Sequence, residues 1–389
     1  VSGEGYFCNT TGGAFTVTLP ASPSAGDIVS VSDYAQTFDT NNLTIGRNGS
    51  NIAGVAIDST LSTEGIAITF VYADATKGWI VTESGLQSDA PGPTFIVATG
   101  GTVTTCGDDK IHTFTGPGTF TVCSVSNCAS NNIVSHVVVA GGGGGGGFGG
   151  GGAGGYREVK NPVNPYTASP LDGYPSAPNR VTVTATAFPI TVGGGGSGNT
   201  SNRAKGSNGN NSVFSTITSA AGGAGGAFGS SDQVPGNDGG SGGGGGALES
   251  SPYPGGSGGT GNTPPVSPAQ GNNGGAGAPS GGAYGGSGGG AGAAGNTSPG
   301  SGTGVAGGAG VTSSINGTPT ARAGGGGGAG GNPGGAGGSG GGGNGAPGPS
   351  PTTATSGTAN TGGGGGGNYV CATAGSGGSG IVIIRYKYQ

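Results

Sequence analysis

The side chains that could act as acids, bases or nucleophiles are few in this sequence. Its two histidines, His112 and His136, lie among Thr or apolar residues in alternating runs, which favours structural positions in strands. A Ser-His-Asp triad needs one positioned base, and no serine stands out as its partner. Asp108 and Asp109 are adjacent and do not supply the two carboxylates across a cleft that glycoside hydrolysis requires. We therefore expect no enzymatic activity and no catalytic residues.

Motifs for metals and cofactors are also missing. The sequence has no HExxH, no Cys and His at zinc-binding spacing and no Gly-Lys dipeptide of a phosphate-binding loop. Matches to GxGxxG fall inside glycine tracts, where composition alone produces them. We expect neither a cofactor nor a metal. Cys123 and Cys128 flank an expected turn, and they could form a disulfide in an oxidising medium or be small thiols in strands.

Residues suited to binding a polar ligand gather in three loops. The longest irregular insertion spans 156–180, a second polar loop spans 199–211, and a third contains SSPYPGG. Tyr rings could stack on sugars there, while charged side chains hydrogen-bond to hydroxyls. Alternatively, each loop only closes a chain reversal, with Tyr packing over Gly backbone. The candidate receptor-binding residues are Tyr166, Asp172, Tyr174, Arg180, Asn202, Arg203, Lys205 and Tyr253.

The composition limits which elements can position these loops. Gly accounts for 104 of the 389 residues and Pro for 24, whereas charged residues make up only 7%, which excludes coiled coils and helical bundles. Only 17 Gly fall within residues 1–140, and the other 87 fall within residues 141–389. Neither part has the dense basic patch of a nucleic-acid-binding protein, and no apolar run is long enough to span a membrane. We expect no nucleic-acid partner and no membrane span.

Residues 1–90 are predicted to form an antiparallel β-domain. Apolar residues alternate with small polar ones in short runs, and turn clusters such as PSAG, RNGSN and ATKG separate the runs. The runs that we expect to be strands are 14–20, 27–34, 42–47, 66–74 and 78–83.

Residues 91–140 also show the sequence pattern of β-strands, and we expect them to form a small β-hairpin base for the glycine-rich region. The GPG turn between HTFT and TFTV predicts a short hairpin over 111–122. The closing segment 379–389 contains IVIIRYKY, the one strongly β-prone run after residue 220, and it is the natural neighbour of VVVA at 137–140. The glycine-rich region would then lie between two paired strands.

The region 141–378 could be a flexible low-complexity tail or a packed bundle. Low charge, flanking strands and Gly at every third position from Gly325 to Gly343 favour the bundle. Three residues per turn is the period of the polyproline II helix, and Gly lets such helices approach closely enough for N–H···O=C and Cα–H···O contacts. We therefore predict a glycine-rich polyproline II bundle, with exposed loops at its reversals and essentially no α-helix.

Two resemblances extend this interpretation. The stretch from GYFCNTTGG to NGSNIAG, followed by ITFVYADATKGW, resembles a small β-module of tailed-phage fibres and other virion proteins, which implies an attachment or shaft module. The order of KIHTFTGPGTFTV, VVVAGGGGGGGFGGGGAGGYRE, NPYTASPL and GGSGIVIIRYKY resembles the glycine-rich receptor-binding region of tailed-phage tail fibres over residues 110–389. That resemblance implies a layered polyproline II bundle whose loops face the bacterial surface.

The sequence thus predicts a mostly β and irregular virion protein, located in a tail fibre or another surface appendage. Its expected partners are a host-surface glycan or outer-membrane protein, other virion tail or fibre proteins, and further copies of itself, as in a trimeric fibre. A non-adhesive structural fibre or decoration protein, or an ice-binding bundle, remains the alternative. The expected parts are an attachment module at 1–90, a β-hairpin base at 91–140, the bundle at 141–378 and a closing strand at 379–389.

Overall fold

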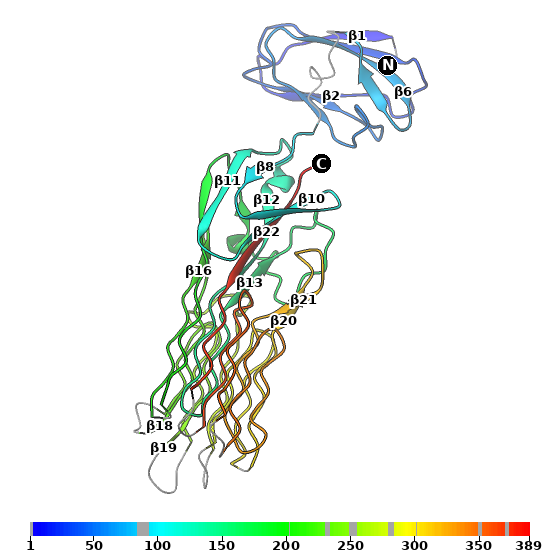
Figure 1. The fold of residues 1–389 in the computed structure, drawn as a ribbon. Helices are drawn as coiled ribbons and strands as arrows, with labels where there is room; N and C mark the ends of the chain where they lie inside the picture. The colour runs from blue at the N-terminus through cyan, green and yellow to red at the C-terminus, as the bar shows by residue number, and fades with distance from the viewer. Residues whose placement is uncertain are drawn as a thin grey trace. The chain divides into compact units, whose positions relative to one another are not determined.

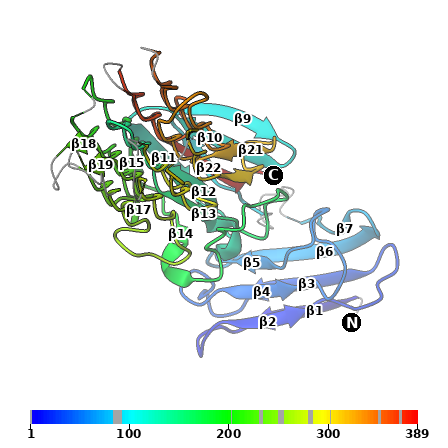
Figure 2. The same cartoon turned by 90° about the horizontal axis from the view of Figure 1, so that it is seen from below.

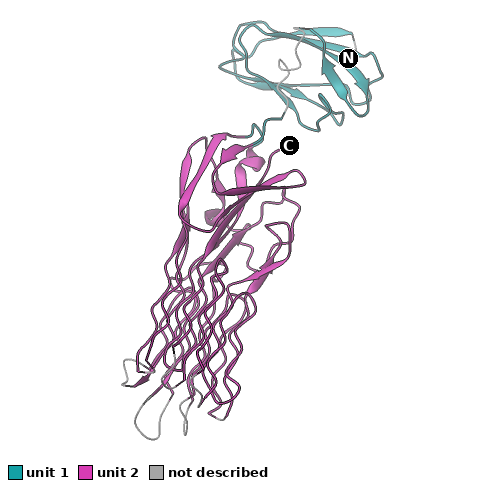
Figure 3. Cartoon of the chain, viewed as in Figure 1, with its two compact units in different colours: residues 1–95, 126–128 teal, residues 96–125, 129–389 magenta. Residues whose placement is uncertain are grey.

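The chain forms two compact units in a computed structural model. One unit comprises residues 1–95 and 126–128, and the other comprises 96–125 and 129–389 (Figure 3). Within the described residues, the ordered elements are β-strands and short 3₁₀ helices, so the predicted mostly β class is confirmed. The described residues are 3–83, 93–201, 203–229, 234–248, 255–278, 284–300, 302–348, 352–369 and 373–389.

The first unit consists of two β-sheets around a shared core (Figure 2). Trp79 and Phe70 from one sheet and Leu43 and Ile45 from the other are fully buried in this core. The predicted strand runs are confirmed, and two further strands, β1 and β5, complete the sheets. The strands are β1 (Glu4–Cys8), β3 (Ile28–Asp33), β6 (Ala67–Asp74) and β7 (Gly78–Val81) in one sheet, and β2 (Phe15–Thr18), β4 (Leu43–Gly46) and β5 (Ser59–Leu61) in the other.

The strand and turn pattern predicted an antiparallel domain, but two of the pairings in this unit are parallel. β1 pairs with β3 and β2 pairs with β4 in parallel, whereas the other pairings are antiparallel. The reason is that the chain alternates between the sheets from β1 to β4. When the chain returns to a sheet after one strand in the other sheet, the new strand runs in the same direction as the earlier strand of that sheet. The two strands can then pair in parallel.

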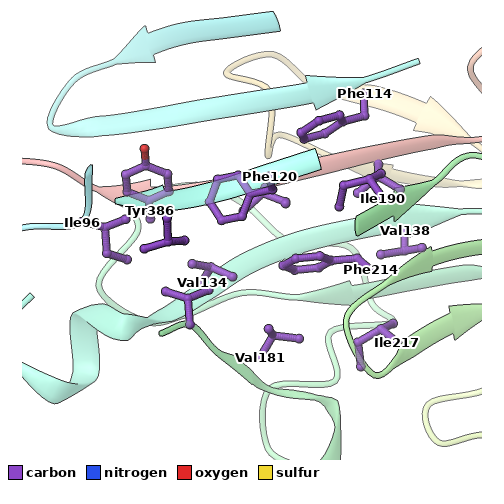
Figure 4. Close-up of a cluster of buried hydrophobic side chains, with 14 of the residues drawn as sticks. Ile96, Phe114, Phe120, Val134, Val138, Val181, Ile190, Phe214, Ile217 and Tyr386 are labelled. Carbon is purple, nitrogen blue, oxygen red and sulfur yellow. The ribbon is translucent and has the colours of Figure 1, made fainter. Parts of the chain in front are cut away.

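The second unit begins with two sheets that enclose an apolar core (Figure 4). Phe120 and Phe214 lie at its centre, with ring centroids 6.2 Å apart. One sheet contains β13 (Tyr156–Val159), β12 (Ile133–Val139), β22 (Ile381–Lys387), β10 (Asp109–Phe114) and β9 (Thr102–Cys106), with β14 (Val181–Thr182) also paired to β12. The other contains β17 (Ile217–Ser219), β16 (Ser212–Phe214), β15 (Ala187–Thr191), β11 (Gly118–Ser124) and β8 (Val97–Thr99).

The closing strand lies where the sequence predicted it. β22 pairs antiparallel with β12, so that Val137 lies opposite Ile383 and Val139 opposite Ile381. The predicted hairpin at 111–122 differs from the structure. The GPG turn joins β10 to β11, but β10 pairs with β9 and β22, while β11 pairs with β8 and β15. The turn is thus a corner between two sheets.

The glycine tracts run side by side away from these sheets as a bundle (Figure 1). Their backbone N–H groups donate to three different neighbouring segments in rotation, and every third residue donates to the same neighbour. This threefold rotation is that of a polyproline II helix. It replaces side-chain packing with backbone hydrogen bonds in several directions. The donor–acceptor pairs at the start of the first tract are Gly141–Asn210, Gly142–Gly378, Gly143–Gly152, Gly144–Ser207, Gly145–Gly375 and Gly146–Gly149.

Short elements complete the second unit. β18 (Phe228–Gly229) and β19 (Ala247–Leu248) form a parallel pair at the end of the bundle remote from the sheets. β20 (Val311–Ser313) and β21 (Thr320–Arg322) form an antiparallel pair. The 3₁₀ helices within the described residues are η2 (Ala129–Asn132) and η3 (Ala177–Asn179).

Candidate ligand-binding surfaces

The insertion at 156–180 is held at the sheet end of the second unit by a buried carboxylate. Glu158 in β13 is 3% exposed and accepts hydrogen bonds from the Tyr156 hydroxyl at 2.9 Å, the Ser313 hydroxyl at 2.5 Å and the Ser169 N–H at 2.9 Å. Burial, followed by the charge of Glu158, raises the pKa of Tyr156 well above its ordinary value. Glu158 therefore anchors the insertion to β20, a strand far away in the chain.

A second buried charge fixes the same insertion to the sheet. Arg385 donates to Asp109 at 2.6 Å, and both side chains are almost fully buried. Asn164 donates to the other oxygen of Asp109 at 2.9 Å and accepts from the Ser135 hydroxyl at 2.7 Å. All polar groups in this chain of contacts are paired, which is the condition for a stable buried ion pair.

Tyr166 belongs to this structural layer. Its side chain is only 9% exposed, and its ring lies 5.2 Å from the Arg385 guanidinium and 5.9 Å from the Lys160 ammonium. Its hydroxyl donates to the Val159 carbonyl oxygen at 3.4 Å. The sequence predicted that Tyr166 contacts a receptor, but its buried side chain leaves little surface for such a contact.

The other candidates of this insertion come together at the protein surface. The Arg180 guanidinium lies 4.4 Å from the centroid of the Tyr174 ring, and its Nε donates to the Tyr174 carbonyl oxygen at 2.7 Å. One oxygen of Asp172 accepts from the N–H groups of Lys160 and Tyr174. Asp172 also lines a pocket of about 160 Å³ together with Gly173, Pro175, Ser176, Ser267 and Pro268. Asp172, Tyr174 and Arg180 thus form one neighbourhood, as the sequence grouping suggested.

The candidates from the second loop lie at the opposite end of the glycine tracts. Ala204 accepts from Gly147, next to the turn that reverses the first tract at Phe148. The neighbouring Lys205 donates from Nζ to the Asn237 side chain at 2.9 Å, and Arg203 is exposed. Arg203 and Lys205 are therefore separated from the 156–180 group by the length of a tract. Asn202 and Tyr253 lie outside the described residues.

An aromatic cluster at this remote end was not predicted from the sequence. The Phe148 ring packs edge-on against Phe228 and Tyr369, with centroids 5.6 and 5.3 Å apart. Phe148 is 1% exposed and has a φ of 92°, which a non-Gly residue rarely adopts. Burial, and then the neighbouring Tyr284, raises the pKa of Tyr369. The sequence signal is an aromatic residue at the end of a glycine run, directly after Gly in GGGFGG and after one Ala in GGAFG and GGAYGG.

The two histidines pack inside the sheets. His112 hydrogen-bonds through Nδ1 to the Gly100 carbonyl oxygen at 2.7 Å and through Nε2 to the Tyr386 hydroxyl at 3.0 Å. His136 is fully buried, and burial lowers its pKa to about 4. Among the described residues, no group of His, Cys, Asp and Glu is arranged to hold a metal ion. No disulfide joins Cys123, which is exposed, to Cys128, which is half-buried.

A family model described as a glycine-rich domain matches residues 113–387. The chain belongs to this family. The glycine-rich domain begins within β10 and ends within β22, and these two strands are paired, so that Thr113 lies opposite Ile383. A search of curated proteins found no match for this chain. In the part of the chain that the structure describes, no helix has the length and apolar character needed to cross a membrane.

Proposed function

We propose that this chain is a bacteriophage tail-fibre adhesin that binds the surface of a host bacterium without catalysing a reaction. The observation that carries the proposal is that neighbouring backbone fills the space beside the tract glycines, so that a side chain has no room there. A Cβ at Gly145 would lie 2.0 Å from the Gly366 carbonyl oxygen, and a Cβ at Gly150 would lie 2.3 Å from that of Gly326. Side chains therefore cannot vary inside the tracts, whereas the turns between the tracts tolerate substitution.

The end of the bundle remote from the sheets is the best candidate for host contact. The chain reversal at Phe148 and the residues 203–205 lie there, and the buried Phe148 ring packs against Phe228 and Tyr369. Backbone hydrogen bonds hold the described tract ends there, such as Gly147 to Ala204 and Phe148 to Asn368, so little conformational entropy is lost when this end binds a surface. Several copies in one particle would multiply weak contacts with a glycan or an outer-membrane protein.

The first unit would serve assembly in this proposal. It has its own buried core, and its large exposed apolar side chains, such as Phe7 at 79% and Tyr34 at 68%, offer surface for other virion proteins or for further copies in a trimeric fibre. The protein would then be located in a tail fibre or another virion appendage.

The test is attachment of the purified chain to host cells. Fluorescently labelled protein should bind susceptible bacteria and compete with phage adsorption. Replacing Arg203 and Lys205 at the remote end by Ala should reduce binding, whereas Lys77→Ala in the first unit is the matched control. A chain that labels no host and does not compete would favour a non-adhesive structural fibre or decoration protein.

A further inference from the structure

The pocket beside Asp172 is built by two segments that are far apart in the chain. Asn179, which is 6% exposed, donates from Nδ2 to the carbonyl oxygens of Ser267 at 2.9 Å and Gly173 at 3.2 Å. Its Oδ1 accepts from Arg157 at 2.6 Å. Asn179 therefore holds both walls of the pocket in place from within the protein.

The walls combine free polar groups with apolar faces. The Asp172 oxygen that accepts from Lys160 and Tyr174 is occupied, but the second oxygen has no hydrogen-bond donor among the described residues. The hydroxyls of Ser176 and Ser267 likewise have no partner in the described part of the chain, and both residues are exposed. The rings of Pro175 and Pro268 supply the apolar surface.

We propose that this pocket binds one pyranose unit of a neutral saccharide. Its volume of about 160 Å³ is below the roughly 300–1,000 Å³ of pockets for drug-sized ligands, which suits a single ring. The carboxylate and the two serine hydroxyls match vicinal sugar hydroxyls, and the proline rings match the C–H face of the sugar. Asp172 would repel a negatively charged sugar, and the Arg180 guanidinium, which donates to the carbonyl oxygen of the lining residue Pro175 at 3.4 Å, opposes the attraction of Asp172 for a cation.

This site is separate from the remote turns of the bundle, so it does not depend on the adhesin role. It would let the side of the glycine-rich domain contact a glycan while the remote end contacts another part of the surface. Two weak sites on one rigid body raise the effective affinity for a surface that carries both ligands.

The test uses the full chain and a panel of neutral methyl pyranosides, measured by saturation-transfer NMR and titration. We expect at least one pyranoside to bind with a dissociation constant on the order of 1 mM, as one sugar ring allows. Asp172→Asn keeps an oxygen that can accept from the N–H groups of Lys160 and Tyr174. It should weaken pyranoside binding about tenfold, because a hydrogen bond from the sugar to a charged carboxylate is lost. Ser267→Ala should weaken it several-fold.

Asp238→Asn is the matched control. Asp238 also accepts from a backbone N–H, that of Thr260 at 2.6 Å, but it lines none of the described pockets. No binding by any pyranoside, equal binding by Asp172→Asn and the parent chain, or preference for a sialic acid or an amino sugar would overturn the proposal. Because the measurement uses no cells, loss of host attachment with intact pyranoside binding would refute the adhesin role alone.

Discussion

Gly141 and Gly194 approach so closely that a Cβ on Gly141 would lie 2.0 Å from the Gly194 carbonyl oxygen. The same relationship recurs along the tracts, where a Cβ on Gly143 would lie 2.1 Å from the Gly223 carbonyl oxygen. Glycine is needed here because the neighbouring backbone occupies the space of a side chain, while φ stays outside the left-handed region. The bundle is thus held by backbone contacts that side chains would prevent.

A single methyl group inside a tract should therefore be costly. Gly143→Ala should lower the free energy of unfolding by about 3 kcal/mol, because the neighbouring backbone must move. Gly116→Ala is the control, since a Cβ at Gly116 would meet nothing within 4 Å. Calorimetric unfolding of both variants checks this, and equal melting temperatures would show that the tracts are loosely packed.

The buried pair of Asp109 and Arg385 should be sensitive to removal of one partner. Arg385→Met leaves the Asp109 carboxylate buried without its charge partner and should cost about 3–5 kcal/mol in the free energy of unfolding. Lys387→Met removes an exposed ion pair with Asp108 at 3.6 Å and should cost less than about 1 kcal/mol. Denaturant titration measures both values, and similar losses for the two variants would contradict the assigned burial.

Stability should fall on acidification because His136 is buried in its neutral form. Burial, with a smaller effect of the nearby Arg157 charge, lowers its pKa to about 4, below the unfolded value of about 6.5. Between these values the unfolded chain binds more protons, so stability is fully present above pH 6.5 and decreases as the pH falls toward 4. The loss from pH 7 to pH 5 should be about 2 kcal/mol.

His136→Leu should remove most of this pH dependence. Denaturant titrations at pH 5, 6 and 7 compare the variant with the parent chain. Burial also lowers the pKa of His112, so a smaller slope of the same sign should remain in the variant. An unchanged slope would show that His136 is not the group that titrates.

The aromatic cluster at the remote end should depend on the ring and the backbone of Phe148 separately. Phe148→Ala removes a buried ring and should destabilise the structure by about 3–5 kcal/mol. Phe148→Gly loses the same ring but accepts the φ of 92° without strain, so it should be about 1 kcal/mol less destabilised than the Ala variant. Hydrogen exchange at Gly149 and Asn368, with global unfolding, tests this order. The reverse order would contradict the assigned backbone geometry.

The sequence was sufficient wherever a local pattern has one spatial solution. Period-two alternation located β3, β6 and β7, and the apolar run at 381–387 predicted its pairing with β12. The pattern did not reveal which sheet each strand joins, because alternation only says which side chains are buried. This is why the parallel pairing of β1 with β3 and the separation of β10 from β11 were not predicted.

For the candidate site, too, some features could be predicted from the sequence and others depend on the tertiary structure. Residues in one loop, such as Asp172, Tyr174 and Arg180, could be grouped from the sequence because they are neighbours along the chain. The hydrogen bond from Asn179 to Ser267, the burial of Tyr166 and the aromatic cluster around Phe148 depend on segments that are far apart in the chain.

The sequence by itself predicted strands on both sides of the glycine-rich region and favoured backbone-packed glycine tracts over a flexible tail, because low charge, flanking strands and the three-residue Gly period suit polyproline II packing. Only the tertiary structure decided which tracts are neighbours and which loops share an end. Glycine tracts carry almost no side-chain information, so their partners are selected by the geometry of the whole lattice rather than by any local residue pattern.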